Sequence, residues 1–199
     1  MLNKFRKYFE KNLNTAAKAL LRLGLTPNLC TAISLAIGFF SAFLIAAKMY
    51  TAAALMVLTS GYLDALDGTL ARLTRGETKT GAFIDSMFDR IVDSTVLLAL
   101  MYSLISESRL LDSMLAALFM ALSLMISYAR ARAESLGIVQ IKGVGLMERA
   151  ERLIFLTILL ILLPYSPGLS TPLLAAADVL AGVTLTERIY KTIKLSLKT

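Results

Sequence analysis

The sequence has no histidine and no tryptophan, and it has one cysteine, Cys30, among 199 residues. Zinc and copper sites are built mostly from histidine and cysteine, so the chain offers almost no ligands for either metal. A single cysteine cannot form a disulfide within the chain. Without histidine no Ser-His or Cys-His pair can form, which disfavours a covalent mechanism through such a nucleophile and leaves an aspartyl-phosphate route open.

Charged residues are also scarce. They make up 18% of the chain against 57% hydrophobic residues, and the mean hydropathy is +0.69, values typical of polytopic membrane proteins. We expect a single membrane domain over residues 1–199. The formal net charge is +7, but the basic residues flank apolar runs and do not alternate with aromatic residues. Membrane lipids and phosphorylated substrates are therefore the expected partners, and nucleic acid is not.

The long apolar runs predict an all-α integral membrane protein with six transmembrane helices. The expected spans are 29–47, 51–73, 82–103, 110–133, 153–163 and 173–190. Before them, apolar residues recur every three or four positions over 2–23 among lysines and arginines, which predicts an amphipathic helix along the membrane interface. A soluble helix packed on a partner is the alternative. We therefore expect a juxtamembrane segment (1–24) and a six-helix bundle (25–199), with Gly24 ending the first helix and Thr26 and Pro27 opening the next.

Lysine and arginine are distributed unevenly between the ends of these runs. Eighteen of the 21 lie in the N-terminal segment, the loop from residue 72 to 79, residues 130–152 and the tail after Glu187. The opposite face has only Lys48 and Arg109. The positive-inside rule then predicts a plasma-membrane protein whose N terminus, C terminus and active site face the cytoplasm.

Four carboxylates interrupt the second and third apolar runs. In helices, Asp64 and Asp67 share one face, as do Asp85 and Asp89. Two such pairs on neighbouring helices can point all four at one spot, where they would ionise together only around cations. Oxygen ligands favour Mg²⁺ or Mn²⁺, so we expect one or two such ions.

The spacing of these carboxylates follows a known signature. Asp64, two residues, Asp67-Gly68, two residues, Ala71-Arg72, eight residues, Gly81, three residues, Asp85, three residues and Asp89 match it at eight fixed positions. In this the chain resembles the CDP-alcohol phosphotransferases, integral-membrane enzymes that displace CMP from a CDP-linked lipid or alcohol with a hydroxyl of a second substrate. The resemblance implies metal binding by the four aspartates and nucleotide binding by residues 68–81.

The expected contacts to the CDP group come from Asn28, Asp64, Asp67, Gly68, Ala71, Arg72 and Gly81. Gly68 and Ala71 leave room for cytidine against the backbone, although small residues also serve helix packing in membranes. Arg72 is placed to contact the pyrophosphate, or else extends to lipid headgroups. Gly81 fits a helix boundary as well as a substrate contact, and for Asn28 a capping role is favoured over a contact to the nucleotide. Arg75, Glu77 and Lys79 are interpreted as loop charges.

A second group of charges lies on the same predicted face. Arg130 and Arg132 end the fourth span, and Arg149 and Arg152 open the fifth. Arginine forks bind phosphate monoesters, so we expect a phosphorylated acceptor, the alternative being that these arginines are cytoplasmic anchors. These segments resemble the phosphatidylinositol-phosphate and archaetidylinositol-phosphate synthase branch, which implies inositol 1-phosphate as acceptor. Glycerol 3-phosphate is the alternative acceptor.

The expected reaction is a single displacement at the cytoplasmic boundary. The aspartate-bound metal neutralises the pyrophosphate of a CDP-lipid, whose tails are diacylglycerol or archaeol, and Asp89 acts as general base. The family resemblance also implies a homodimer. A divalent cation transporter and a noncatalytic lipid-binding scaffold are the rival functions. Asp93 and Asp178 have no assigned role.

Overall fold

The structure, a computed structural model, describes residues 2–74, 78–138 and 144–197, with side chains from residue 12 onward. Its helices are α1 (Leu2–Arg22), α2 (Pro27–Ala46), α3 (Tyr50–Leu73), α4 (Lys79–Ser106), α5 (Leu110–Ser135), α6 (Arg149–Leu162) and α7 (Ser170–Ser196), with a short 3-10 helix, η1 (Pro167–Leu169), before α7. A helix is present at each of the seven ranges that the sequence predicts. Arg75 and Glu77 lie outside the described residues.

The turn between α1 and α2 confirms the predicted helix signals. Gly24 has φ +78°, a conformation that glycine adopts without strain, and it follows the last residue of α1. Thr26 caps α2, accepting a hydrogen bond at its Oγ1 from the Leu29 amide at 3.3 Å, and Pro27 occupies the first helical position.

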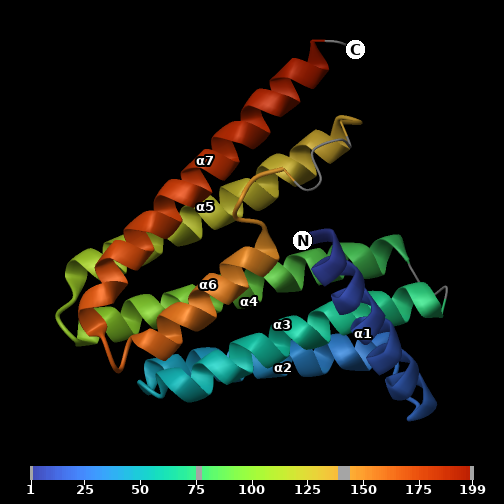
Figure 1. The fold of residues 1–199 in the computed structure, drawn as a ribbon, viewed down its shortest axis with the longest axis horizontal. Coiled ribbons are helices and arrows are strands. Elements are labelled where there is room, and N and C mark those ends of the chain that lie inside the picture. The colour runs from blue at the N-terminus through green and yellow to red at the C-terminus, as the bar shows by residue number, and fades with distance from the viewer. Residues whose placement is uncertain (1, 75–77, 139–143, 198–199) are drawn as a thin grey trace.

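The helices form an antiparallel bundle whose members pack in a definite order (Figure 1). α2 lies against both α3 and α4, α4 also contacts α5, and α6 packs on α3. α7 runs along α5, and the ends of both extend beyond the other helices (Figure 1). α1 crosses the bundle and contacts α3, with Leu13 and Ala17 buried against Cys30, Leu66 and Leu70.

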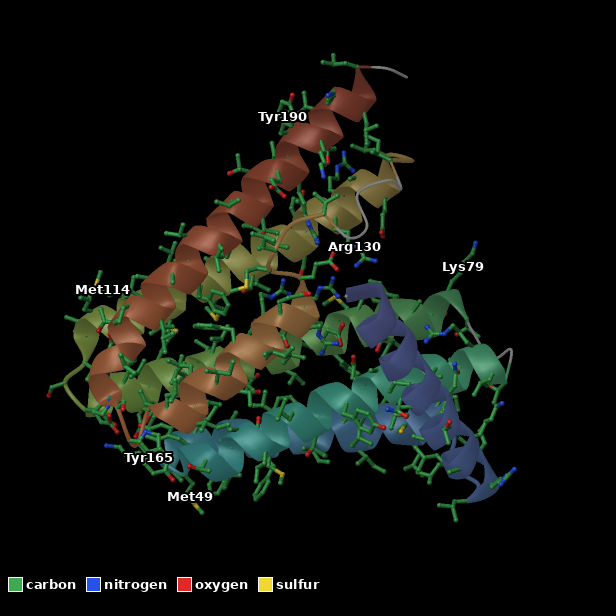
Figure 2. The ribbon with its side chains drawn as sticks, in the orientation of Figure 1. Met49, Lys79, Met114, Arg130, Tyr165 and Tyr190 are labelled. Carbon is green, nitrogen blue, oxygen red and sulfur yellow. The ribbon has the colours of Figure 1, made fainter. Side chains whose placement is uncertain are left out.

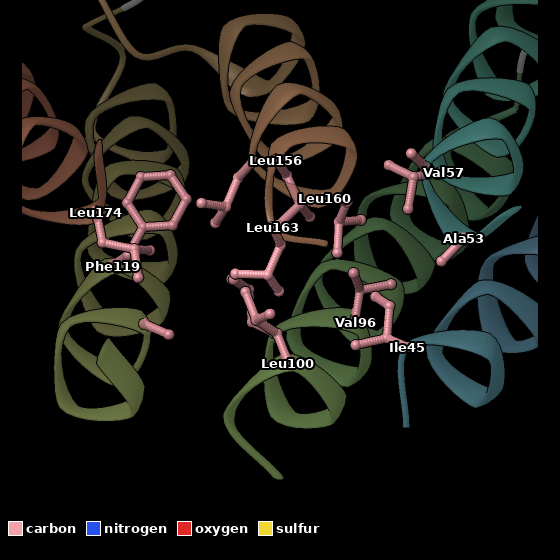
Figure 3. Packing of buried hydrophobic residues seen from close by; sticks show 14 of the residues in the cluster. Ile45, Ala53, Val57, Val96, Leu100, Phe119, Leu156, Leu160, Leu163 and Leu174 are labelled. Carbon is pink, nitrogen blue, oxygen red and sulfur yellow. The ribbon is translucent and has the colours of Figure 1, made fainter. Parts of the chain in front are cut away.

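One apolar cluster joins α2 to α7. Figure 3 shows Ile45, Val57, Val96, Leu100 and Leu160 meeting at its centre. At Gly38 of α2, an added Cβ would lie 2.6 Å from Cγ1 of Val92 in α4. A small residue is needed there because α2 and α4 are in direct contact.

Among the described residues, three helical segments are long and apolar enough to cross a membrane: Pro27–Ala46, Leu110–Ser135 and Pro167–Ser196. Helices α3, α4 and α6 do not meet this criterion of length and hydropathy, for identifiable reasons. α3 and α4 carry the signature aspartates, and α6 has 14 residues, about 21 Å of helix against a hydrocarbon core of about 30 Å. The structure therefore shows an all-α protein with helices long and apolar enough to span a membrane, and the number of six spans stays a prediction.

Polar contacts close the end of the bundle that carries Met49, Met114 and Tyr165 (Figure 2). Arg109, just before α5, pairs with Asp112 at 2.6 Å, and Asp112 accepts hydrogen bonds from Ser170 at 3.0 Å and from Thr171. These contacts attach the turn between α4 and α5 to the start of α7. Lys79, Arg130 and Tyr190 lie toward the other end (Figure 2).

Candidate active site

Three of the four signature aspartates meet between α3 and α4. Asp64 and Asp67 lie in the last turns of α3, and Asp85 lies in the second turn of α4. One carboxylate oxygen from each lies within 4.8 Å of the others. The i,i+3 spacing along α3 places two of them on one face, and α4 supplies the third.

The oxygens of these three residues fit a hard divalent cation. Two oxygens on one Mg²⁺ lie at most about 4.2 Å apart, since each bond is about 2.1 Å. The oxygens observed here lie within 4.8 Å of one another, so small side-chain rotations would bring them to the spacing that a bound ion requires. Three carboxylates at this distance repel one another strongly in a partly buried site, which further favours a cation among them.

Asp67 is the most enclosed of the signature aspartates, with 5% of its surface exposed. Thr31 of α2 donates a hydrogen bond from its hydroxyl to Oδ2 of Asp67 at 2.7 Å. The same hydroxyl also bonds to the Pro27 carbonyl at 3.1 Å, which ties it to the first turn of α2. Thr31 therefore orients Asp67 from a helix that the signature does not include, and a threonine one turn after Asn28 was the only sequence signal for it.

Asp89 lies one turn of α4 beyond Asp85 and is held by an arginine. Nη2 of Arg149, the first residue of α6, lies 2.8 Å from Oδ1 of Asp89, and its Nη1 lies 2.5 Å from Oδ2 of Asp64. Nε of Arg149 is 3.8 Å from Asp93, one oxygen of which has no hydrogen-bond partner. One guanidinium thus bridges α3 and α4 beside the three clustered carboxylates.

A narrow cleft connects these groups, lined by Thr31, Ser34, Asp64, Asp85, Asp89 and Arg149 among others. Next to it, Asp93, Arg149 and Arg152 border a mostly apolar cavity between α2, α3, α4, α5 and α6. The charged groups therefore meet apolar helix faces at one place, an arrangement suited to a substrate with an ionic head and an apolar tail.

The residues expected to contact CDP lie around the aspartates. Gly68 and Ala71 follow Asp67 on α3, and Arg72 is exposed, with its Nη2 bonded to Thr69 at 3.0 Å. Gly81 lies in the first turn of α4, where its amide bonds to the capping Thr78 hydroxyl at 2.9 Å. Asn28 is exposed at the second position of α2. Because its amide donates to the capping threonine, Gly81 belongs to the start of a helix, which is one of the two roles predicted for it.

The four predicted acceptor arginines have separate contact partners. Arg149 reaches the aspartates, and Arg152 is buried one turn later with its Nη1 on the Met147 carbonyl at 3.0 Å. Arg130 pairs with Glu134 at 3.0 Å within α5, and Arg132 is exposed. Arg188 of α7, predicted only as one of the basic residues of the tail, is 2% exposed and bonds to Glu148, next to Arg149, at 2.9 Å.

The fold and this site define an all-helical membrane protein with acidic and basic side chains gathered at one end of its bundle. Residues 24–186 match the profile of the CDP-alcohol phosphatidyltransferases, and the chain belongs to that family. The resemblance read from the signature is thereby confirmed, and the chain is a transferase of phospholipid synthesis.

Two relatives and two solved structures show the likeness over nearly the whole chain. The archaetidylinositol phosphate synthase of Pyrococcus horikoshii is 32% identical over 194 residues, covering 98% of this chain and 97% of the relative. That of Aeropyrum pernix is 34% identical over 196 residues, with 94% of each covered.

The solved structures are of the phosphatidylinositol phosphate synthase of Mycobacterium tuberculosis. With CDP-DAG bound, it has a TM-score of 0.76 and 28% identity, covering 90% of this chain and 92% of that chain. In complex with manganese and citrate, it has a TM-score of 0.79 and 29% identity, covering 90% and 88%.

Proposed function

We propose that this protein transfers a phosphatidyl-type group from a CDP-lipid to inositol 1-phosphate and releases CMP. The observation that carries the proposal is the bridge of Arg149 between Asp64 and Asp89, beside the cluster of Asp64, Asp67 and Asp85. It places a guanidinium suited to a phosphate next to carboxylates suited to a divalent cation. The inositol-phosphate relatives support the choice of acceptor.

In this proposal, Asp64, Asp67, Asp85 and Asp89 hold one or two Mg²⁺ or Mn²⁺ ions. A divalent ion there neutralises the donor pyrophosphate and stabilises the charge that builds on departing CMP. The manganese complex of the solved relative supports this assignment. Thr31 and Arg149 belong to the same site, since each contacts one or two of these carboxylates.

Asp89 is the proposed general base. It lies on the Arg149 side of the carboxylates, where an acceptor phosphate bound by that guanidinium would bring a hydroxyl close to it. Asp89 would then take the proton of the attacking hydroxyl as the new P–O bond forms and CMP leaves.

The donor is proposed to enter with its tails along the apolar helix faces and its head at the cleft. Gly68 and Ala71 leave space for cytidine, and Arg72, Gly81 and Asn28 surround the same end of the bundle. The CDP-DAG complex of the solved relative supports a CDP-lipid donor. Archaeol tails are supported by the archaeal relatives, and diacylglycerol tails by the mycobacterial one.

For the acceptor, Arg149 and Arg152 are the proposed inner contacts and Arg130 and Arg132 the outer ones. Arg149 and Arg152 are one turn apart on α6 and border one cavity, whereas Arg130 and Arg132 lie at the end of α5. A phosphate entering from that end would meet the outer pair first.

We further propose one membrane domain over residues 1–199, with α2 to α7 as six spans and α1 along the interface. The unbroken apolar cluster through α2 to α7 supports a single domain. The bias of lysine and arginine supports a cytoplasmic site and termini in the plasma membrane. A homodimer is proposed on family resemblance.

The test is CMP release from purified protein with Mg²⁺ or Mn²⁺ and a CDP-lipid. Separate reactions would contain inositol 1-phosphate, glycerol 3-phosphate, free inositol or serine, and one would contain EDTA. We expect release only with inositol 1-phosphate and metal, loss of release in Asp64→Asn, and no loss in the exposed control Glu187→Gln. Release with glycerol 3-phosphate and not with inositol 1-phosphate would make glycerol 3-phosphate the acceptor. Release with an unphosphorylated acceptor would refute the assignment of the arginines to an acceptor phosphate.

A further inference from the structure

The segment that leads into α6 is held in place by α7. Residues 144–148 connect to the first residue of α6, Arg149, and Val144 and Met147 are 6% and 4% exposed. Their side chains are buried in two different apolar clusters. Burial of these two side chains also buries the backbone amides and carbonyls of the segment, which then need hydrogen-bond partners. Side chains of α7 supply them.

Thr184 of α7 accepts hydrogen bonds from two backbone amides of this segment. Its Oγ1, fully buried, accepts hydrogen bonds from the amides of Leu146 at 3.0 Å and Met147 at 3.1 Å. Gly145 has φ +106°, and a Cβ there would lie 2.2 Å from Cγ2 of Thr184. The segment can lie this close to α7 only because residue 145 is glycine.

Arg188, one turn further along α7, holds the same segment from its other side. Its Nε donates to the Val144 carbonyl and its Nη1 to the Ile126 carbonyl of α5, both at 3.0 Å. Its Nη2 bonds to Glu148 at 2.9 Å. A guanidinium presents its donors on three nitrogens in a fixed plane, which suits three acceptors on different segments, whereas the donors of an ammonium all lie on one nitrogen.

These contacts continue into the site. Glu148 immediately precedes Arg149, whose guanidinium reaches Asp64 and Asp89. Arg152 turns back to bond the Met147 carbonyl at 3.0 Å, so the start of α6 is tied to the segment that α7 holds. The position of Arg149 therefore depends on contacts made by α7, a helix that contains none of the signature aspartates.

We propose that Thr184 and Arg188 are positioning residues, which hold residues 144–148 so that Arg149 reaches Asp64 and Asp89. The consequence for the reaction rests on the proposed function, in which Arg149 binds the acceptor phosphate. The placement itself can be tested without turnover.

The first measurement is hydrogen exchange at the Leu146 and Met147 amides in detergent-solubilised protein. Thr184→Val keeps the shape of the side chain and removes the acceptor oxygen, so exchange at both amides should rise about tenfold or more. Thr184→Ser keeps the oxygen and should retain protection. The matched control is Thr186→Val, an exposed threonine of α7 whose hydroxyl bonds only to the Gly182 carbonyl of its own helix at 2.9 Å.

The second measurement is Mn²⁺ affinity, by electron paramagnetic resonance, in a double-mutant cycle. Arg149→Gln removes a positive charge that contacts two carboxylates, so Mn²⁺ should bind on the order of tenfold more tightly. Thr184→Val should shift the Kd in the same direction, and the double variant should match Arg149→Gln alone, because Thr184 acts through Arg149. A purely structural contribution would instead change both backgrounds equally.

Wild-type exchange in Thr184→Val, or additive effects on the Kd, would overturn the proposal. If Thr184→Val does not fold, Arg188→Lys takes its place in the Mn²⁺ cycle, with the same expected shift of the Kd and the same expected match to Arg149→Gln in the double variant. Absence of CMP release from the wild-type protein with every acceptor would refute the proposed function only, since neither measurement depends on turnover.

Discussion

Single residues decide how the carboxylates of the site differ. Asp67 is 5% exposed and accepts a hydrogen bond from Thr31, whereas Asp89 is paired with Arg149. Two aspartates of the same signature therefore have different surroundings. A hydroxyl donor fixes the orientation of a ligand carboxylate, and a guanidinium competes with a cation for it.

We predict that Thr31→Val weakens Mn²⁺ binding by about tenfold, because loss of a residue that orients a metal ligand typically costs 10- to 100-fold in affinity. Mn²⁺ titration followed by electron paramagnetic resonance measures this. Thr59→Val is the control, since that exposed threonine bonds only to the Leu55 carbonyl within α3 at 2.7 Å. Equal affinities for the Thr31 variant and the wild type would show that the hydrogen bond from Thr31 does not orient a metal ligand.

We predict that Asp89→Asn lowers CMP release by about 10²- to 10⁴-fold, the range that general base catalysis contributes. CDP-lipid binding should remain measurable by calorimetry, because Asp64, Asp67 and Asp85 are unchanged. Glu187→Gln removes an exposed carboxylate and should have wild-type turnover. Turnover retained in Asp89→Asn would remove Asp89 from the role of base.

At the scale of whole elements, α2 is the support of the site. It contacts α3 and α4, the two helices that bear the aspartates, and it contributes Thr31. At Gly38 it packs against the Val92 side chain of α4, which also lines the cleft beside Asp89. The separation of the helices and the shape of the cleft therefore depend on the same contact.

We predict that Gly38→Ala lowers the Tm in detergent by about 3 to 9 °C, since overpacking costs about 1–3 kcal/mol. Val92 is β-branched and cannot easily rotate away from the added methyl group. Adding Val92→Ala should recover most of the loss, and Gly182→Ala, where a Cβ meets nothing within 4 Å, should change little. An unchanged Tm in Gly38→Ala would mean that α2 and α4 are not in such close contact.

The α5 and α7 pair is the second element-scale feature. The two helices pack along each other, and α7 bonds to Asp112 at one end of the bundle and to residues 144–148 at the other. α6, with 14 residues, is thus bordered at both ends by segments attached to α7. This explains how a short helix can hold Arg149 at a defined place.

At the scale of the whole molecule, the charge distribution implies an orientation in the membrane. Lys79 and Arg130 lie toward the end of the bundle with the site, and Met49 and Tyr165 lie at the opposite end (Figure 2). The proposed cytoplasmic site therefore places Tyr165 outside the cell.

We predict opposite labelling of two cysteines introduced in a Cys30→Ala background. In intact cells a membrane-impermeant maleimide should react with Tyr165→Cys, whose native side chain is 75% exposed, and not with Lys79→Cys. Permeabilised cells should label both. Labelling of Lys79→Cys in intact cells would reverse the orientation.

The sequence by itself determined the helical class, the positions of the helices and the family. Composition and apolar run length depend only on local residues, and so do the Gly24 turn and the Thr26 cap, which the structure reproduces. The aspartate signature was equally readable, because within one helix spacing alone decides which side chains share a face.

Only the tertiary structure decided which charges meet. Asp64 and Arg149 are 85 residues apart, and their contact exists because α6 packs on α3. Four arginines of similar local sequence context were expected to act together, yet Arg149 reaches the aspartates and Arg130 pairs with Glu134 within α5. Arg188, which was not among these four, is buried against residues 144–148. Contacts between distant segments depend on how helices pack, and helical periodicity carries no information about that.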